Sequence, residues 1–182
     1  MTMKILLHIC CAPCAIYPLK LLRSEGFDVV GYFYNRNIHP YEECLRRENA
    51  LRAYAEQVDL KVIYQQGYEM EAFLRNMAFR EENRCSICYH DRLNAAASVA
   101  RHGKFDYYTS TLLQSKHQQH EVIRSIGENV GKAQGVPFFY RDFREGWKEG
   151  IETSKELNMY RQQYCGCIYS EKERYYRGSK KT

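Results

Sequence analysis

Long apolar runs are missing from this sequence, and so is any N-terminal segment that would direct the chain to a membrane. No stretch approaches the roughly 18 consecutive apolar residues that a membrane-spanning helix needs. The start, MTMKILLHICC, has too short an apolar run for a signal peptide and no small-residue cleavage pattern. We therefore expect a cytoplasmic protein without membrane contacts, in a compartment where thiols stay reduced.

Glycine is missing from the loop that follows the first apolar run. That loop reads CCAPC, whereas enzymes that activate a substrate with a nucleotide need glycines there, so that the backbone can approach the phosphates. This absence disfavours a nucleotide-activating enzyme, such as one that inserts sulfur into tRNA.

Internal repeats, low-complexity linkers and shifts in composition are also missing, so we expect a single domain over residues 1–182. The net charge of +5 is modest, and 16 tyrosines supply rings that can stack on bases or pack in a core. The tail at about residues 171–182 is basic and reads EKERYYRGSKKT, with cations at Lys172, Arg174, Arg177, Lys180 and Lys181. Such a segment suits either a solvated terminus or a surface that binds RNA.

Strand-like and helix-like segments alternate along the chain, which predicts an α/β fold with a parallel sheet. Strands are expected at 4–10, 28–35, 60–66, 105–113 and 136–143. Helices are expected at 15–25, 40–58, 70–80 and 120–134. A turn at 84–93 is expected to lead into another helix, and the last segment is expected to form a helix that ends near residue 169. Gly26 stands where the first helix needs a C-terminal cap.

Eight cysteines are present, and seven of them fall in three tight clusters: Cys10/Cys11/Cys14, Cys85/Cys88 and Cys165/Cys167. The eighth, Cys44, shares a helical face with apolar residues and is expected in the core. The first cluster follows a strand, at the end of the sheet where α/β proteins place their sites. Helix N-termini also lower the pKa of thiols there. In a reducing compartment, clustered cysteines favour metal binding or catalysis.

The C-S-I-C pair at 85–88 lets two sulfurs converge on one centre, as zinc and iron–sulfur sites require, or act as a redox dithiol. A closed zinc site needs four ligands and leaves three clustered cysteines without a role, so a redox cluster explains more of the set. In C-G-C at 165–167, glycine permits a tight turn. This pair suits either a reversible, strained disulfide that relays electrons or two ligands to a second metal.

Six stretches together resemble the QueH-type epoxyqueuosine reductases. They are LLHICCAPC, NRNIHPYEE, RCSICYHDRL, TSTLLQSKHQ, YRDFR and SKELNMYRQQYCGC, and they run in order from residue 6 to residue 167. The resemblance implies a Rossmann-like parallel sheet related to the adenine-nucleotide-hydrolase (HUP-like) fold. It also implies the last step of queuosine synthesis, in which an epoxide on the modified wobble base of tRNA loses its oxygen as water. The implied partners are the tRNA anticodon loop carrying epoxyqueuosine and an unidentified electron donor.

The resemblance also implies cofactors and residue roles. It implies a [4Fe–4S] cluster, whose ligands carry over to Cys10, Cys11, Cys85 and Cys88. A second, mononuclear iron is implied beside the cluster, with Cys14 as a candidate ligand. Cys165 and Cys167 would then be the redox-active pair.

Removing the oxygen of an epoxide takes two electrons, two protons and a group that polarises the carbon–oxygen bond. An iron–sulfur cluster passes one electron at a time, so a dithiol or second metal would supply what it lacks. Candidate proton donors in the matched stretches are His8, His39, Tyr89 and Asp142, and we take His8 and Asp142 as candidate catalytic residues. On a buried strand, His8 suits a hydrogen-bonded core histidine equally well.

Two other classes of function compete with this reading. A zinc-stabilised RNA-binding module would be colourless and inactive in redox reactions. A cytosolic thiol–disulfide oxidoreductase using Cys85 and Cys88 would turn over a generic disulfide without a metal.

Overall fold

The fold is built on a parallel sheet whose central strand leads into the first cysteine cluster. The computed structural model describes residues 2–177. Its strands are β1 (Lys4–Ile9), β2 (Asp28–Phe33), β3 (Val62–Tyr64) and β4 (Tyr107–Ser110), in the order β3-β2-β1-β4. β1 pairs with β2 from Lys4 to Ile9 and with β4 from Ile5 to His8, all in parallel. The predicted α/β fold with a parallel sheet is confirmed.

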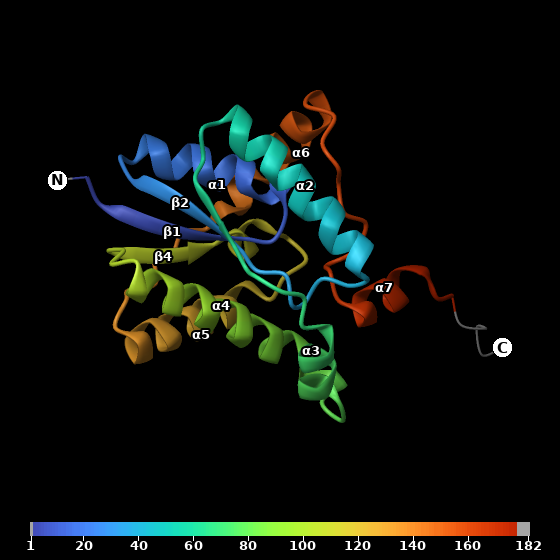
Figure 1. Ribbon diagram of the computed structural model, residues 1–182. Coiled ribbons are helices and arrows are strands. Elements are labelled where there is room, and N and C mark those ends of the chain that lie inside the picture. Colours follow the sequence, from blue (N-terminus) through green and yellow to red (C-terminus); the bar gives the residue numbers. More distant parts are fainter. Residues whose placement is uncertain (1, 178–182) are drawn as a thin grey trace.

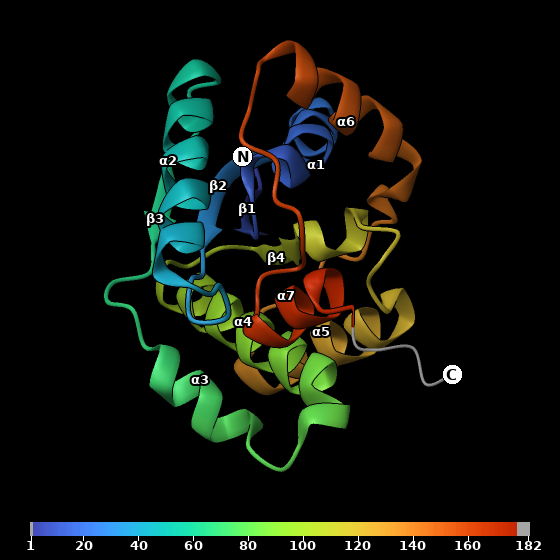
Figure 2. The same cartoon turned by 90° about the vertical axis from the view of Figure 1, so that its right-hand side faces the viewer.

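Helices cover both faces of the sheet (Figure 1). On one face lie α1 (Ala12–Ser24), α2 (Tyr41–Gln57) and α6 (Trp147–Glu156), and on the other lie α4 (Arg84–His102) and α5 (His120–Gln134). Two shorter helices, α3 (Met70–Met77) and α7 (Ile168–Tyr175), lie beyond the carboxyl ends of the strands (Figure 2). Short 3-10 turns complete the set: η1 (Glu81–Asn83), η2 (Thr111–Gln114) and η3 (Phe143–Gly146).

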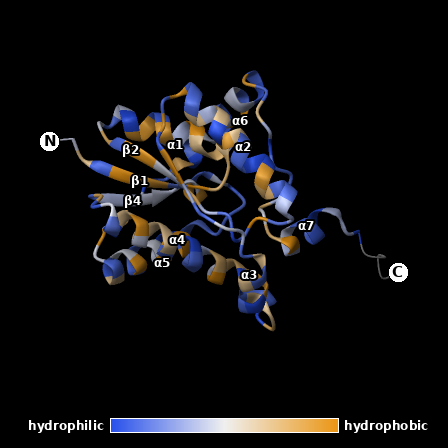
Figure 3. Ribbon diagram, in the orientation of Figure 1, coloured by the Kyte–Doolittle hydropathy of each residue, from blue (hydrophilic) through white to orange (hydrophobic). Residues whose placement is uncertain are grey.

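The core lies between these layers because the strands carry mainly apolar residues, which Figure 3 shows along β1 and β2. Every residue of β1 after Lys4 is buried, and Cys44 on α2 is buried as predicted. Gly26 has φ +86° directly after the C-cap of α1, which confirms its predicted role. No helix within residues 2–177 is both long and apolar enough to cross a bilayer.

The first helix begins at Ala12 rather than the expected residue 15, because Pro13 suits a first helical turn and Cys11 takes the N-cap position. Cys85 and Cys88 lie within the first two turns of α4, not in a turn before it. Both shifts place cysteines directly at helix N-termini.

Two predicted elements are wrong. The expected strand at 136–143 forms a single parallel bridge between Phe138 and Tyr108, since Pro137 has no N–H to donate to a ladder. The expected last helix stops at Glu156, and Asn158 then adopts a left-handed conformation with φ +49°. Residues 157–167 are irregular and run from α6 to α7 across the carboxyl ends of the strands (Figure 2).

Candidate functional site

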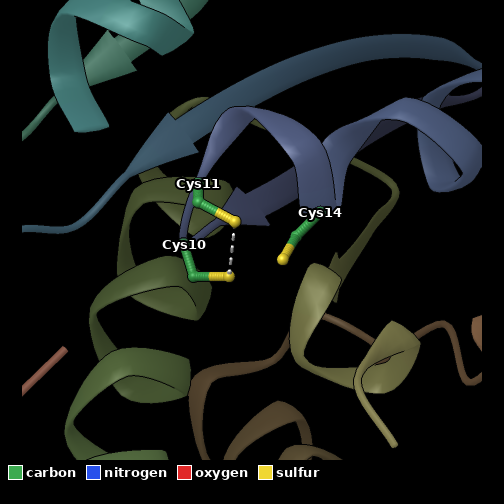
Figure 4. A group of neighbouring side chains, drawn as sticks. All are labelled: Cys10, Cys11 and Cys14. Atoms are coloured by element: carbon green, nitrogen blue, oxygen red, sulfur yellow. Dashed lines mark hydrogen bonds between the residues drawn. The ribbon is translucent and has the colours of Figure 1, made fainter. Parts of the chain in front are cut away.

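The first cysteine cluster forms a compact group of three thiols at the end of β1. Cys10 directly follows the strand, Cys11 is the N-cap of α1, and Cys14 lies in the first turn of that helix. The three side chains point toward one another (Figure 4). All three Sγ atoms lie within 4.8 Å of one another, and those of Cys10 and Cys11 are 3.8 Å apart. The group can therefore bind one metal ion with three sulfur ligands.

The three thiols of this group differ in their pKa. Hydrogen bonds from Cys11 and Cys14 hold the pKa of Cys10 well below its ordinary value. Burial and the neighbouring Cys10 raise the pKa of Cys11, and hydrogen bonds to both neighbours raise that of Cys14. The first proton therefore leaves from Cys10.

Polar side chains from distant parts of the chain donate hydrogen bonds to these sulfurs. Gln162 Nε2 donates to Cys11 Sγ at 2.9 Å and to Cys14 Sγ at 3.5 Å, and Thr111 Oγ1 donates to Cys10 Sγ at 3.4 Å. Donors aimed at sulfur stabilise a thiolate or a metal-bound sulfur.

The second cluster lies on α4. Cys85 and Cys88 are half-buried, and burial raises the pKa of Cys88 to about 12 and also raises that of Cys85. Neither belongs to the group of three sulfurs within 4.8 Å. Cys165 and Cys167 add to this rise in the pKa of both thiols, so the second and third clusters face the same region.

The third cluster lies where residues 157–167 reach α7. Cys165 is exposed, Cys167 is the N-cap of α7, and all eight cysteines of the chain are free thiols. Gly166 between them has φ +152°, a conformation that L side chains rarely adopt, as the C-G-C pattern predicted. The backbone here is anchored: His39 N–H donates to Gly166 O at 2.8 Å, and Arg47 Nη1 donates to Cys165 O at 2.8 Å.

A cavity of about 690 Å³ lies between the first and third clusters. Cys10, Cys14 and Cys165 contribute to its wall, together with Arg92. Amide and aromatic side chains complete the wall, among them Gln114, Gln118, Gln163, His117, Trp147 and Tyr164. This volume suits a ligand the size of a modified nucleobase, and the amides suit its polar edges.

Comparisons with known proteins agree with this geometry. The family profile described as Epoxyqueuosine reductase QueH matches residues 5–173. The chain belongs to the QueH family. It is 38% identical over 175 residues to the epoxyqueuosine reductase QueH of Dehalococcoides mccartyi, covering 96% of each chain. It is 34% identical over 179 residues to that of Thermotoga maritima, covering 93% of this chain and 91% of the relative. The predicted resemblance is confirmed.

One solved structure shows the same fold at low sequence identity. It is a predicted subunit of a tRNA methyltransferase from Methanocaldococcus jannaschii, with a TM-score of 0.57 and 9% identity over 85% of this chain and 75% of that one. The similarity supports the fold of this QueH-family chain, and no function is transferred from it.

Among the proton donors predicted for this QueH-family chain, His8 is fully buried and contacts Arg92, which lines the cavity. Its Nδ1 contacts Ser110 Oγ at 2.7 Å, and its Nε2 accepts from Arg92 Nε at 3.3 Å. Burial, and then the positive charge of Arg92, lowers the pKa of His8 to about 3. The ring is therefore neutral with its proton on Nδ1, and the structure gives it hydrogen-bonded partners rather than a place in the cavity wall.

The remaining predicted donors lie outside the cavity wall as well. Asp142 is the N-cap of η3 and pairs with Arg144, which lowers the pKa of Asp142 to about 2. His39 is buried and supports the Cys165–Cys167 segment, whereas Tyr89 donates to Gln118 Oε1 at 2.9 Å. The catalytic roles of His8 and Asp142 stay predictions.

Sequence reasoning missed Arg92, Arg47 and Gln162 as site residues. Arg92 follows Cys88 by four residues on one helix, and this spacing places both side chains on one face. The spacing is visible in the sequence and is the signal that could have identified Arg92. Arg47 and Gln162 reach the site only through tertiary contacts with the third and first clusters, and no local pattern marks them.

Proposed function

We propose that this chain removes the epoxide oxygen of epoxyqueuosine at the wobble position of tRNA and forms queuosine, using a [4Fe–4S] cluster. The observation that carries the proposal is that the first and third cysteine clusters line one cavity of nucleobase size. The reaction consumes two electrons and two protons, and the oxygen leaves as water. An external electron donor, still to be identified, would supply the electrons in the cytoplasm.

The donor set fits iron–sulfur chemistry. Thiolates are the ligands of such clusters, and the first two clusters supply Cys10, Cys11, Cys85 and Cys88 as the proposed set. Cys14 remains for a second iron, with its sulfur close to those of Cys10 and Cys11. When bound, the cluster would supply single electrons at low potential.

The third cluster can balance the reaction by itself. Oxidation of the Cys165 and Cys167 thiols to a disulfide releases two electrons and two protons, the number that the epoxide consumes on becoming an alkene and water. The strain of a ring closed over one intervening residue makes such a disulfide easy to reduce again. Because Cys165 lines the cavity, we assign the pair as the redox-active dithiol.

The cavity rim provides a surface for the anticodon loop. Arg161 and Arg174 line the cavity, and Tyr175 and Tyr176 on or next to α7 are 54% and 68% exposed. Single-stranded RNA is held by cations on its phosphates and aromatic rings under its bases. Lys180 and Lys181 of the predicted basic tail lie outside the described residues.

The first test is an absorbance spectrum with iron, sulfide and zinc analysis on protein purified without oxygen. We expect a brown protein with about four sulfides and four or five irons per chain. The loaded protein should then convert epoxyqueuosine-tRNA to queuosine-tRNA when a chemical reductant is added.

Other outcomes identify the competing functions. A colourless protein that holds one zinc, even after cluster reconstitution, would replace the reductase with a zinc-stabilised RNA-binding module. Turnover of a generic disulfide by metal-free protein would indicate a thiol–disulfide oxidoreductase instead.

A further inference from the structure

Arg92 is a fully buried cation without a carboxylate partner. Its exposed fraction is 1%, it forms no ion pair with an acidic residue in the described range 2–177, and its Nη1 has no hydrogen-bond partner there. The other arginine of the site is built differently. Arg47 is also 1% exposed, but its Nε lies 2.7 Å from Glu43 Oε1 in a buried ion pair. Burying an unpaired guanidinium is costly, so another anion must balance Arg92.

The groups that can become anions around Arg92 are sulfurs. Cys88 precedes it by one helical turn on the same face of α4, and Cys10 and Cys165 line the same cavity as Arg92. Arg92 therefore lies among members of all three cysteine clusters.

A chain of hydrogen bonds sets the orientation of the guanidinium. Arg92 Nε donates to His8 Nε2 at 3.3 Å, and His8 Nδ1 donates in turn to Ser110 Oγ at 2.7 Å. Ser110 is held by Leu112 N, which donates to its Oγ at 3.1 Å. The paired strands β1 and β4 thus direct the guanidinium toward the sulfurs.

We propose that Arg92 is the resident counter-ion of the cysteine site, oriented by His8, and that its charge raises the reduction potential of the metal cluster held there. The inference rests on the proposed iron–sulfur function. A reduced cluster carries one more negative charge than an oxidised one, so a fixed cation nearby favours the reduced form. Arg92 is a positioning and charge-balancing residue, and His8 acts through it.

The test compares the reconstituted full chain with three variants in anaerobic redox titrations followed by absorbance and electron paramagnetic resonance. Arg92→Gln removes the charge, Arg92→Lys keeps it, and Arg101→Gln removes an exposed charge from the same helix. For Arg92→Gln we expect a ratio of reduced to oxidised cluster at least about tenfold lower at a given potential, a shift of about 59 mV for a one-electron couple. Arg92→Lys and Arg101→Gln should titrate close to the wild type.

Each outcome bears on the proposal. An Arg92→Gln protein that holds its cluster at the wild-type potential overturns it. If Arg92→Gln does not hold a cluster, Arg92→Lys decides: iron and sulfide at wild-type content support the charge requirement, and their loss overturns it. Circular dichroism of the metal-free variants identifies a misfolded one, and His8→Leu then takes its place in the titration. In His8→Leu the Arg92 side chain loses its orienting acceptor, so the reduction potential of the cluster must fall. An unchanged potential overturns the proposal. If the wild type itself binds no cluster, the proposed function fails separately.

Discussion

Eight chemically identical side chains acquire different properties in this protein from the atoms around them. Cys44 is surrounded by apolar residues of the core. Cys10 accepts hydrogen bonds from neighbouring thiols and from Thr111, which lower its pKa, whereas burial raises that of Cys88. Cys165 is exposed at the cavity wall, where a substrate can reach it. At the scale of the residue, environment separates the core thiol from the proposed ligands and from the proposed redox thiols.

This separation predicts the effect of losing one thiol of the proposed redox pair. Cys165→Ser should lower turnover of epoxyqueuosine-tRNA at least about 100-fold, since serine cannot form a disulfide, while iron and sulfide content stay at the wild-type level. Single-turnover assays and metal analysis measure both quantities. Cys44→Ala is the matched control and should keep activity. Loss of iron in Cys165→Ser would show that Cys165 is a metal ligand.

His39 predicts a pH dependence of stability. Its Nε2–H donates to Arg36 O at 3.0 Å and its Nδ1 accepts from Ile168 N at 3.3 Å, so the folded protein requires the neutral ring. Burial lowers the pKa of His39. The unfolded state therefore binds a proton that the folded state does not, and stability is lost as pH falls below about 6.5.

Urea unfolding at pH 7 and pH 5 measures this effect. His39→Asn should lose less stability over this range than the wild type does, by up to about 2 kcal/mol. His90→Asn, at an exposed position of α4, is the control and should follow the wild type. An equal pH dependence in His39→Asn would contradict the prediction.

At the scale of the element, the irregular segment 157–167 is held by α2 rather than by regular structure of its own. Arg47 donates to the carbonyl oxygens of Tyr164 and Cys165, and Glu43 accepts from the hydroxyl of Tyr160 as well as from Arg47. One buried ion pair therefore anchors the segment that carries the third cysteine cluster.

Two neighbouring ion pairs on α2 allow a matched test of this anchor. Arg47→Gln leaves Glu43 buried without its partner and should lower the free energy of unfolding by about 3–5 kcal/mol. Arg46→Gln breaks the exposed pair with Glu42 and should change it by less than about 0.5 kcal/mol. Both values come from urea unfolding, and similar losses in the two variants would refute the anchor.

At the scale of the whole molecule, one end of the sheet gathers every cysteine cluster. β1 and α1 carry the first, α4 the second, and the segment before α7 the third (Figure 2). The first and third clusters line one cavity. Helices close the two faces of the sheet, so the carboxyl end is the side on which a large substrate can approach.

This placement predicts where tRNA binds. Arg161→Gln and Arg174→Gln, both at the cavity rim, should each weaken tRNA binding and reduce the slope of log affinity against log salt by about 1. Lys132→Gln, in the last turn of α5, removes the same charge from an exposed position away from the cavity wall and should change neither. Fluorescence anisotropy at several salt concentrations measures both quantities. Equal effects of all three variants would show that net charge alone governs binding.

The periodicity of the chain by itself determined the strands β1 to β4 and the helices α1 to α5. The spacing of the cysteines placed seven of them in three clusters. These features follow from local patterns, because strand and helix periods and cysteine spacing are properties of neighbouring residues. The strand expected at 136–143 was wrong because Pro137 cannot donate to a ladder, so that only Phe138 forms a bridge. The long last helix was wrong because Asn158 turns the chain with φ +49°.

Only the tertiary structure decided which clusters share a cavity and which charges accompany them. Arg47 lies over 100 residues from Cys165 in the sequence, and so does His8 from Ser110, yet each pair is joined by a hydrogen bond. The partner of a buried charge is set by how helices and strands pack in space. Local sequence patterns predicted the thiols of the site, and packing supplied the cations and donors that control them.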